Sequence, residues 1–291
     1  MRRFEYVAPQ SLEEAVQALA QRPGARALAG GTDIIVQMKE AATRFPFPSC
    51  LVSLDRIAEL KEISFDDSEG LRIGAGATMA DIAQSAVIRE RFRGIAEGAG
   101  IVGSVQTMNM ATLGGNLCNA APSADTAPPL LAHEAQAVIV GPSGRRTLTL
   151  EEFFRSPGLT ALAGDELLAE VRVPSPSPNT GSAYTRHTPR KQMDIAVVGV
   201  AAVLTLDGET SRTARIALGA VAPTPIRVRV PEAVLEGQPL SDEVLARAAE
   251  AAAGAARPIS DTRGSAEFRT HLVRVITERM LAEAARRAES G

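Results

Sequence analysis

The sequence contains few of the residues that build metal sites or disulfide frameworks. It has two cysteines, Cys50 and Cys118, which do not follow C-x-x-C spacing, and three single histidines, His133, His187 and His271. These numbers exclude a disulfide framework and an iron–sulfur or four-cysteine metal site built from this chain alone. Because a metal site needs several ligands that converge, we expect each histidine to have a surface or packing role and the chain to hold no metal.

Excess charge of one sign and long apolar runs are also lacking. The net charge is -3, hydrophobic residues make up 45% and charged residues 22%. This balance is ordinary for a globular protein and gives no support for nucleic-acid binding. No segment reaches the roughly 20 apolar residues of a membrane span, and the first residues lack the apolar run of a signal peptide. We therefore expect a cytoplasmic protein with no membrane span and no nucleic-acid partner.

Capping signals and short apolar runs alternate along the first half of the chain. Ser11 and Glu14 form a capping box, which predicts a helix that ends near Pro23. Apolar runs bounded by turn residues predict strands at 27–29, 50–54, 71–75, 137–140 and 170–173. Helical signals fall at 34–39, from about 78 to 99, and from Pro128 onward. We predict that 111–119 is a glycine-rich loop.

The clearest linker is segment 174–182, in which proline alternates with serine before a glycine. This composition predicts an extended, exposed connection, so we place a domain boundary there, with domains at 1–176 and 177–291. Two modest domains suit a chain of 291 residues. Beyond the linker, predicted strands at 194–205 and 215–221 precede alanine-rich amphipathic helices at 242–256 and 265–288.

Two glycine-containing segments are the candidates for ligand binding. The candidate residues are Ala29, Gly30, Gly31, Thr32 and Asp33 in the first segment, and Thr112, Gly114, Gly115 and Asn116 in the second. Paired glycines let the backbone approach a ligand closely, and successive amides in such turns suit phosphate oxygens. Two such segments match the two phosphates of a dinucleotide, whereas either segment alone is more typical of a tight turn without a ligand. We expect valine at either second-segment glycine to abolish binding with little loss of fold.

A third glycine motif points to a different cofactor. Segment 74–79 begins like the fingerprint of nicotinamide-binding Rossmann domains, but Met79 occupies the place of the third glycine. A bulky side chain there blocks the close packing of helix on strand. The sequence also has no Gly-Lys-Ser/Thr phosphate motif. A nucleotide-binding Rossmann domain is therefore not favoured.

The two glycine segments resemble the FAD loops of the medium subunits of carbon monoxide dehydrogenase and xanthine dehydrogenase, in the molybdenum hydroxylase family. The matching stretches are 29–33 with Met38-Lys39, 106–116, 122–131, 184–196 and 219–225, so the similarity covers nearly the whole chain. It implies an α+β fold: a two-subdomain FAD-binding domain of the vanillyl-alcohol-oxidase (PCMH) type, then a small α/β C-terminal domain of the CO dehydrogenase flavoprotein type.

The resemblance also implies roles for residues outside the glycine pairs, which would hold the pyrophosphate of FAD. Asp125 would contact the ribose or adenosine side, with helix capping before Pro128 as the alternative or additional role. Leu168, otherwise read as a core residue, would lie near the flavin or adenine. Arg186 replaces a lysine common in the family and either places a cation near the flavin N1/C2 carbonyl or is exposed. Cys118 either packs against the flavin or is buried and inert.

The function implied by the resemblance is an electron relay. A molybdopterin-binding large subunit would oxidise the substrate, a [2Fe–2S] small subunit would conduct electrons, and FAD on this chain would pass them to a terminal acceptor. We expect a dimer of such heterotrimers and no catalytic residue in this chain. Two alternatives stay open, a self-sufficient FAD oxidoreductase, which would need a larger substrate domain, and a flavin-free scaffold subunit.

Overall fold

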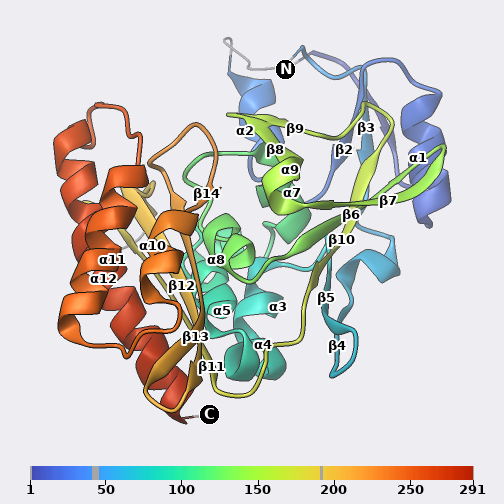
Figure 1. Cartoon of the computed structure of the whole chain (residues 1–291). Coiled ribbons are helices and arrows are strands. Elements are labelled where there is room, and N and C mark those ends of the chain that lie inside the picture. The colour runs from blue at the N-terminus through green and yellow to red at the C-terminus, as the bar shows by residue number, and fades with distance from the viewer. Residues whose placement is uncertain (1, 41–45, 191–192, 291) are drawn as a thin grey trace.

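The computed structural model describes residues 2–40, 46–190 and 193–290. They form two units that pack against each other (Figure 1). One hydrophobic cluster lies within the C-terminal unit, and the other fills the N-terminal unit and includes residues of the C-terminal sheet. The N-terminal unit contains a parallel and an antiparallel sheet, and the C-terminal unit contains one antiparallel sheet covered by helices. This is the mixed helix-and-sheet fold that the resemblance implies.

A small parallel sheet holds the first glycine segment. Its strands, in spatial order, are β1 (Glu5–Val7), β3 (Cys50–Ser53) and β2 (Ala25–Leu28). Helix α1 (Leu12–Ala20) packs on this sheet and begins as predicted, because the Ser11 hydroxyl accepts from the Glu14 amide. The Glu14 carboxylate reaches one residue further back and accepts from the Gln10 amide at 2.8 Å.

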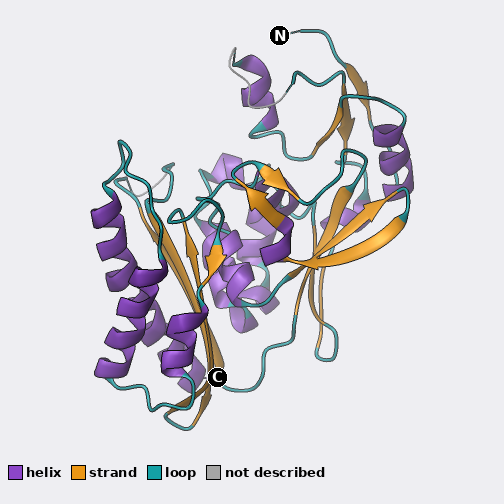
Figure 2. Ribbon diagram, turned by 45° about the horizontal axis from the view of Figure 1, so that its top comes forward, coloured by secondary structure: helices purple, strands orange, loops and turns teal. Residues whose placement is uncertain are grey.

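The second sheet is antiparallel and forms the other half of the N-terminal unit. Its strands, in spatial order, are β4 (Ile63–Asp66), β5 (Gly70–Gly74), β10 (Leu167–Val173), β6 (Gln136–Gly141) and β7 (Gly144–Thr149). A separate hairpin pairs β8 (Phe154–Ser156) with β9 (Leu159–Thr160). Strand β10 is the central strand of this sheet, and the linker to the C-terminal unit follows it directly. Figure 2 shows this sheet beside the helical middle of the molecule.

Short helices fill the space between the sheets. They are α2 (Ile34–Lys39), the 3-10 helix η1 (Ala58–Lys61), α3 (Met79–Gln84), α4 (Ala86–Arg91), α5 (Arg93–Gly100), α6 (Val105–Met108), α7 (Leu113–Asn119), α8 (Ala127–Ala132) and α9 (Leu150–Phe153). The helical pattern predicted from 78 to 99 is interrupted, because Ser85 and Phe92 both leave helical geometry. The predicted loop at 111–119 is wrong, since most of it is helix α7.

The C-terminal unit is one antiparallel sheet with helices on its outer face. Its strands run in sequence order, β11 (Thr180–His187), β12 (Val198–Asp207), β13 (Thr210–Gly219) and β14 (Ile226–Arg227). Its helices are α10 (Arg229–Leu235), α11 (Asp242–Ala255) and α12 (Ala266–Ser290). Helices α5 and α8 contact the other face, so β12 is buried on both sides, which explains its continuous apolar run. Strand β12 starts later, and β13 earlier, than predicted.

The linker is shorter than its composition indicates. Gly181 and Ser182, which we expected to be exposed, are buried in β11. A Cβ on Gly181 would lie 2.0 Å from the Ala284 carbonyl oxygen, so glycine lets α12 lie directly on this strand. The boundary between residues 176 and 177 falls in the connection from β10 to β11 and stays a prediction.

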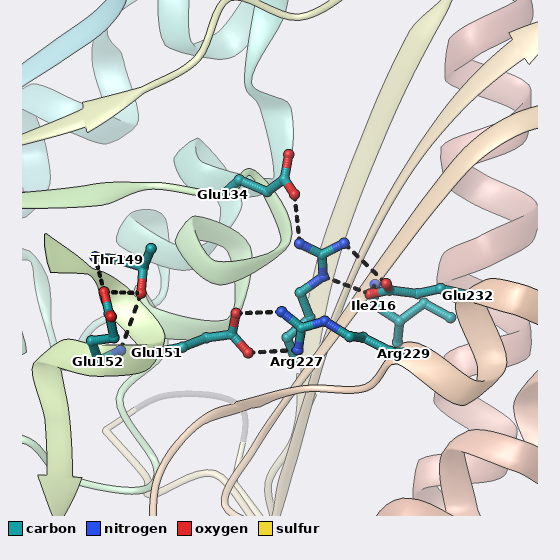
Figure 3. Close-up of polar contacts among 8 residues, drawn as sticks. All are labelled: Glu134, Thr149, Glu151, Glu152, Ile216, Arg227, Arg229 and Glu232. Atoms are coloured by element: carbon teal, nitrogen blue, oxygen red, sulfur yellow. Dashed lines mark hydrogen bonds and ion pairs between the residues drawn. The ribbon is translucent and has the colours of Figure 1, made fainter.

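Ion pairs connect the two units near α8 and α9 (Figure 3). Arg227 of β14 binds Glu134, which follows α8, at 2.6 Å, and binds Glu232 of α10 at 2.9 Å. Arg229 binds Glu151 of α9 at 2.7 Å. The Arg227–Glu232 pair is largely buried, whereas the Arg229–Glu151 pair is exposed. Charged residues of the C-terminal unit therefore fix the ends of α8 and α9.

No helix in the described ranges is both long enough and apolar enough to cross a lipid bilayer. The cytoplasmic location that we expect from the sequence stays a prediction.

Candidate functional site

A cavity of about 740 Å³ lies where the glycine segments meet the C-terminal unit. The N-terminal unit lines it with the loop before α2, with α7 and with the β8–β9 hairpin, and the C-terminal unit lines it with the end of β11 and with Asp194. The cavity includes every residue that the sequence predicts as a ligand contact: Ala29, Gly30, Gly31, Thr32, Asp33, Thr112, Gly114, Gly115, Asn116, Cys118, Asp125, Leu168 and Arg186. The fold thus brings together positions scattered over more than half of the chain.

The first glycine segment is an open loop between β2 and α2. Gly31 has φ +75°, a left-handed conformation that favours glycine. A Cβ on Gly30 would lie 1.8 Å from the Met110 carbonyl oxygen, so this glycine lets the two candidate segments touch. Within the described residues, no protein acceptor faces the amides of Gly31, Thr32 and Asp33. These N–H groups are available to a ligand, as we expect for a phosphate-binding loop.

The second glycine segment differs from the expected loop, because its amides are used inside the protein. The Gly114 amide donates to the Ala75 carbonyl at 2.7 Å. The Gly115 amide donates to the Thr112 hydroxyl at 3.1 Å, and the Asn116 amide donates to the Thr112 carbonyl at 3.0 Å. Thr112 therefore caps α7. This segment offers side chains and a surface without Cβ atoms rather than a cluster of free amides.

The adjacent glycines of α7 have different surroundings. A Cβ on Gly114 would lie 2.7 Å from the Ala75 Cβ and 2.8 Å from its carbonyl oxygen, so Gly114 is needed for packing α7 on the end of β5. For Gly115, the nearest described atom is the Thr112 hydroxyl oxygen, at 3.1 Å. The expectation that valine at either position would spare the fold is therefore wrong for Gly114 and stays a prediction for Gly115.

A buried ion pair links the C-terminal unit to the cavity. Arg186, on β11, binds Asp125 in the loop before α8, and both side chains are 7% exposed. The Tyr184 hydroxyl donates to the other Asp125 oxygen at 2.8 Å. The alternative of an exposed Arg186 is thus wrong. Helix capping by Asp125 is wrong as well, because Thr126 is the N-cap residue of α8 and both Asp125 oxygens accept from β11.

Burial shifts the protonation equilibria in this part of the cavity. It raises the pKa of Asp125 to about 6, while the charge of Arg186 and the Tyr184 hydroxyl act in the opposite direction. The same burial raises the pKa of the Tyr184 hydroxyl well above its usual value. Asp125 therefore changes charge close to neutral pH, whereas Tyr184 stays a hydrogen-bond donor.

Cys118 on α7 and Leu168 on β10 both line the cavity. The Cys118 thiol is half-buried on α7, yet the dense protein around it raises its pKa to about 12, so it is a neutral thiol at physiological pH. Leu168 of β10 is 4% exposed and belongs to the hydrophobic core as well as to the cavity wall. Both residues present apolar surface to a ligand.

Several cavity residues carry no motif that would identify them in the sequence. They include Arg26 on β2, Gly103 before α6 and Thr107 within α6. Asp194 and Ile195, after β11, fall in the matching stretch 184–196 but were not predicted as ligand contacts. Arg26 had one available signal, because a charged residue interrupts an otherwise apolar strand. The segment from Thr160 to Glu166 also contributes to the wall. These positions reach the cavity through tertiary packing, which local sequence patterns do not report.

Two family models together match most of the chain. The FAD binding domain in molybdopterin dehydrogenase matches residues 2–176, and the CO dehydrogenase flavoprotein C-terminal domain matches residues 183–284. The chain is 34% identical to the xanthine dehydrogenase FAD-binding subunit of Escherichia coli O157:H7 over 275 residues, covering 94% of this chain and 93% of the relative. It is 36% identical to the carbon monoxide dehydrogenase medium chain of Hydrogenophaga pseudoflava over 280 residues, covering 96% of each.

Solved structures show the same fold. A chain of carbon monoxide dehydrogenase from Hydrogenophaga pseudoflava that lacks the Mo-pyranopterin moiety of the molybdenum cofactor superimposes with a TM-score of 0.92 at 36% identity, covering 98% of each chain. A chain of quinoline 2-oxidoreductase from Pseudomonas putida 86 gives a TM-score of 0.91 at 31% identity, covering 99% of this chain and 98% of that chain. The protein therefore belongs to the family of FAD-binding medium subunits of molybdenum-containing dehydrogenases.

Proposed function

We propose that the 740 Å³ cavity holds one FAD and that the chain relays electrons from the [2Fe–2S] clusters of a partner subunit to a terminal acceptor. The observation that carries this proposal is the convergence of both glycine segments and of Arg186 on one cavity. A volume of this size is within the range of cofactor sites. Bound FAD would supply the redox chemistry, and the chain supplies binding, orientation and charge.

The two glycine segments fit complementary tasks around a pyrophosphate. Among the residues that the structure describes, the amides of Gly31, Thr32 and Asp33 have no acceptor, so they can donate to phosphate oxygens. Gly115 presents no side chain to the cavity, so a ligand can approach the backbone of α7 there. Thr126 donates to the Asn116 side-chain oxygen at 2.6 Å and fixes this amide at the cavity wall. The first loop would bind the negative charge of the pyrophosphate, and the second segment would set the shape of the cavity.

Arg186 supplies a fixed positive charge to the same cavity. Its side chain is held by Asp125, and Asp125 is held by Tyr184, so the guanidinium has little freedom to turn away. A cation at this place would favour negative charge on a bound flavin ring or on a phosphate. We therefore assign Arg186 to cofactor binding, and Asp125 and Tyr184 to the positioning of Arg186. In this proposal Asp125 acts through Arg186 in addition to any contact with the ribose.

The relatives support the relay rather than the two alternatives. Proteins of nearly the same length are named as FAD-binding subunits or medium chains of dehydrogenases, which makes a multi-subunit complex the consistent assignment. We propose that the partners are a molybdopterin-binding large subunit and a [2Fe–2S] small subunit, in a dimer of heterotrimers. The substrate would bind on the large subunit.

Purification of the tagged chain from its native host tests this proposal. The expected result is a complex that contains FAD, iron and molybdenum, in which an added reductant bleaches the iron–sulfur and flavin absorbance together. The Gly115→Val variant should assemble the same complex with iron and molybdenum but without FAD. A chain that purifies alone with FAD and oxidises an organic substrate by itself would contradict the relay and support a self-sufficient oxidoreductase.

A further inference from the structure

Strand β11, which carries Arg186, lies at the edge of the C-terminal sheet. It pairs with β12 on one side and has no strand on the other side in the sheet order. An edge strand presents backbone N–H and C=O groups that need other partners. Two charged side chains supply them here, Glu97 from α5 and Arg287 from the last turns of α12.

The Glu97 carboxylate connects the strand to α12. One of its oxygens accepts from the Tyr184 backbone amide at 2.9 Å, and the other binds the Arg287 guanidinium at 2.6 Å. Arg287 also donates to the Ser182 carbonyl at 2.6 Å. The side chains of Glu97 and Arg287 are 28% and 20% exposed, so these charge-assisted hydrogen bonds are partly shielded from water. The pair therefore fixes two backbone groups on the free edge of β11.

Helix α5 packs directly on the same part of the strand (Figure 1). The Gly94 amide donates to the Ser182 hydroxyl at 3.0 Å. A Cβ on Gly94 would lie 3.4 Å from the Ala183 carbonyl carbon, which places the helix backbone close to the strand. Glu97 follows one turn later on this helix. The contact joins a helix of the N-terminal unit to a strand of the C-terminal unit, so it sets the position of β11 relative to the glycine segments.

Tyr184 links this edge contact to the cavity. Glu97 holds its backbone, and its hydroxyl donates to Asp125 at 2.8 Å. Asp125 in turn binds Arg186. A Cβ on Gly199 would lie 2.7 Å from the Tyr184 hydroxyl oxygen, so glycine in β12 leaves room for the phenol. A displacement of the strand at Tyr184 would therefore move both groups that bind Asp125.

We propose that Glu97 and Arg287 are positioning residues for the cofactor site. Neither residue lines the large cavity, but together they hold the edge of β11 where Arg186 enters it. Supporting contacts of this kind keep a binding group within a fraction of an ångström of its working place. The inference rests on the proposed binding of FAD, and it assigns part of the FAD affinity to a helix near the end of the chain.

A double-mutant cycle on FAD affinity, measured by fluorescence titration of the full chain, tests this inference. Glu97→Ala should weaken FAD binding by about fivefold or more in the unmodified chain, but by less than about twofold in an Arg186→Met background, because both changes remove the same interaction. Arg287→Met should show the same pattern. Arg286→Met is the matched control, because this neighbouring arginine is exposed and binds Glu283 on its own helix. It should leave FAD affinity unchanged.

The conservative variant Glu97→Gln gives a second readout. It keeps an acceptor for the Tyr184 amide and should recover FAD affinity to within about twofold of the unmodified chain. Urea unfolding shows whether each variant is folded. Unchanged affinity in Glu97→Ala, or an equal loss in both Arg186 backgrounds, would overturn the inference and leave the network a contact for stability alone.

Two further outcomes have defined meanings. If Arg186→Met binds FAD too weakly for the cycle, the rescue decides, and failure of Glu97→Gln to recover affinity would overturn the inference. A chain that takes up no FAD in any form would contradict the proposed function itself. FAD binding that does not respond to Glu97 or Arg287 would contradict only the positioning role.

Discussion

Sequence patterns identified individual site residues but not the physical role of each. The paired glycines and Asp125 could be selected from the sequence, and all of them line one cavity. Their physical roles could not. Gly114 packs against Ala75 and Gly115 faces the cavity, although the two are neighbours in an identical local pattern. The difference arises from a strand end about 40 residues away in the chain, which no local motif encodes.

Valine substitutions separate these two roles. Gly115→Val should keep its fold and lose at least tenfold in FAD affinity, because the new side chain enters the cavity wall. Gly114→Val should lose about 1–3 kcal/mol of unfolding free energy, because it overpacks the contact with Ala75. Gly254→Val, in open space on α11, is the control and should change neither property. Urea unfolding and fluorescence titration with FAD measure both quantities. Full FAD affinity in folded Gly115→Val would refute the assignment of this wall to the cofactor.

The buried carboxyl of Asp125 predicts a pH dependence. Its pKa rises from 3.8 to about 6 on folding, so the folded state holds this proton more tightly than the unfolded state does. The resulting stabilisation is complete below about pH 4 and is lost as the pH rises through about 6. Relative to Asp125→Asn, the unmodified chain should lose up to about 3 kcal/mol of unfolding free energy across this window.

Urea unfolding at several pH values, with exposed Asp207→Asn as the control, measures this dependence. A difference between chain and variant that stays constant with pH, or that grows in favour of the unmodified chain as pH rises, would contradict a raised pKa. It would mean that the charge of Arg186 lowers the pKa of Asp125 by more than burial raises it.

Secondary-structure elements were predictable where local signals and packing agree. Helix α1 begins at its predicted cap, α11 begins at its predicted first residue, and α8 begins beside its predicted prolines. Helix α7 was missed because its two glycines lower helix propensity and because Thr112, which caps it, was predicted only as a ligand residue. Contacts with the end of β5 and with Ala77 hold this segment in helical form. Tertiary packing thus overrode local propensity at the candidate site itself.

The ion pairs between the units differ in their expected contribution. Arg227→Met should cost about 3–5 kcal/mol of unfolding free energy, because it leaves Glu232 buried without its cation. Arg229→Met should cost less than about 1 kcal/mol, because its pair with Glu151 is exposed. Urea unfolding of both variants measures this contrast, and Figure 3 shows the two pairs side by side. Equal costs would show that burial does not set the strength of these contacts.

At the scale of the whole molecule, the cavity depends on both units. The sequence indicated two domains and a resemblance that covers nearly the entire chain, and the family assignment is confirmed. It did not indicate that the first strand after the linker inserts Arg186 into the cavity to meet Asp125, because the two residues are 61 positions apart. The C-terminal unit is therefore part of the candidate cofactor site.

The visible absorption spectrum of the purified chain, with chromatography of the released cofactor, tests the central claim most directly. We predict a flavin spectrum and one FAD per chain, with the flavin lost in folded Gly115→Val. A colourless protein that also fails to take up added FAD would contradict the account and would favour a scaffold subunit without flavin.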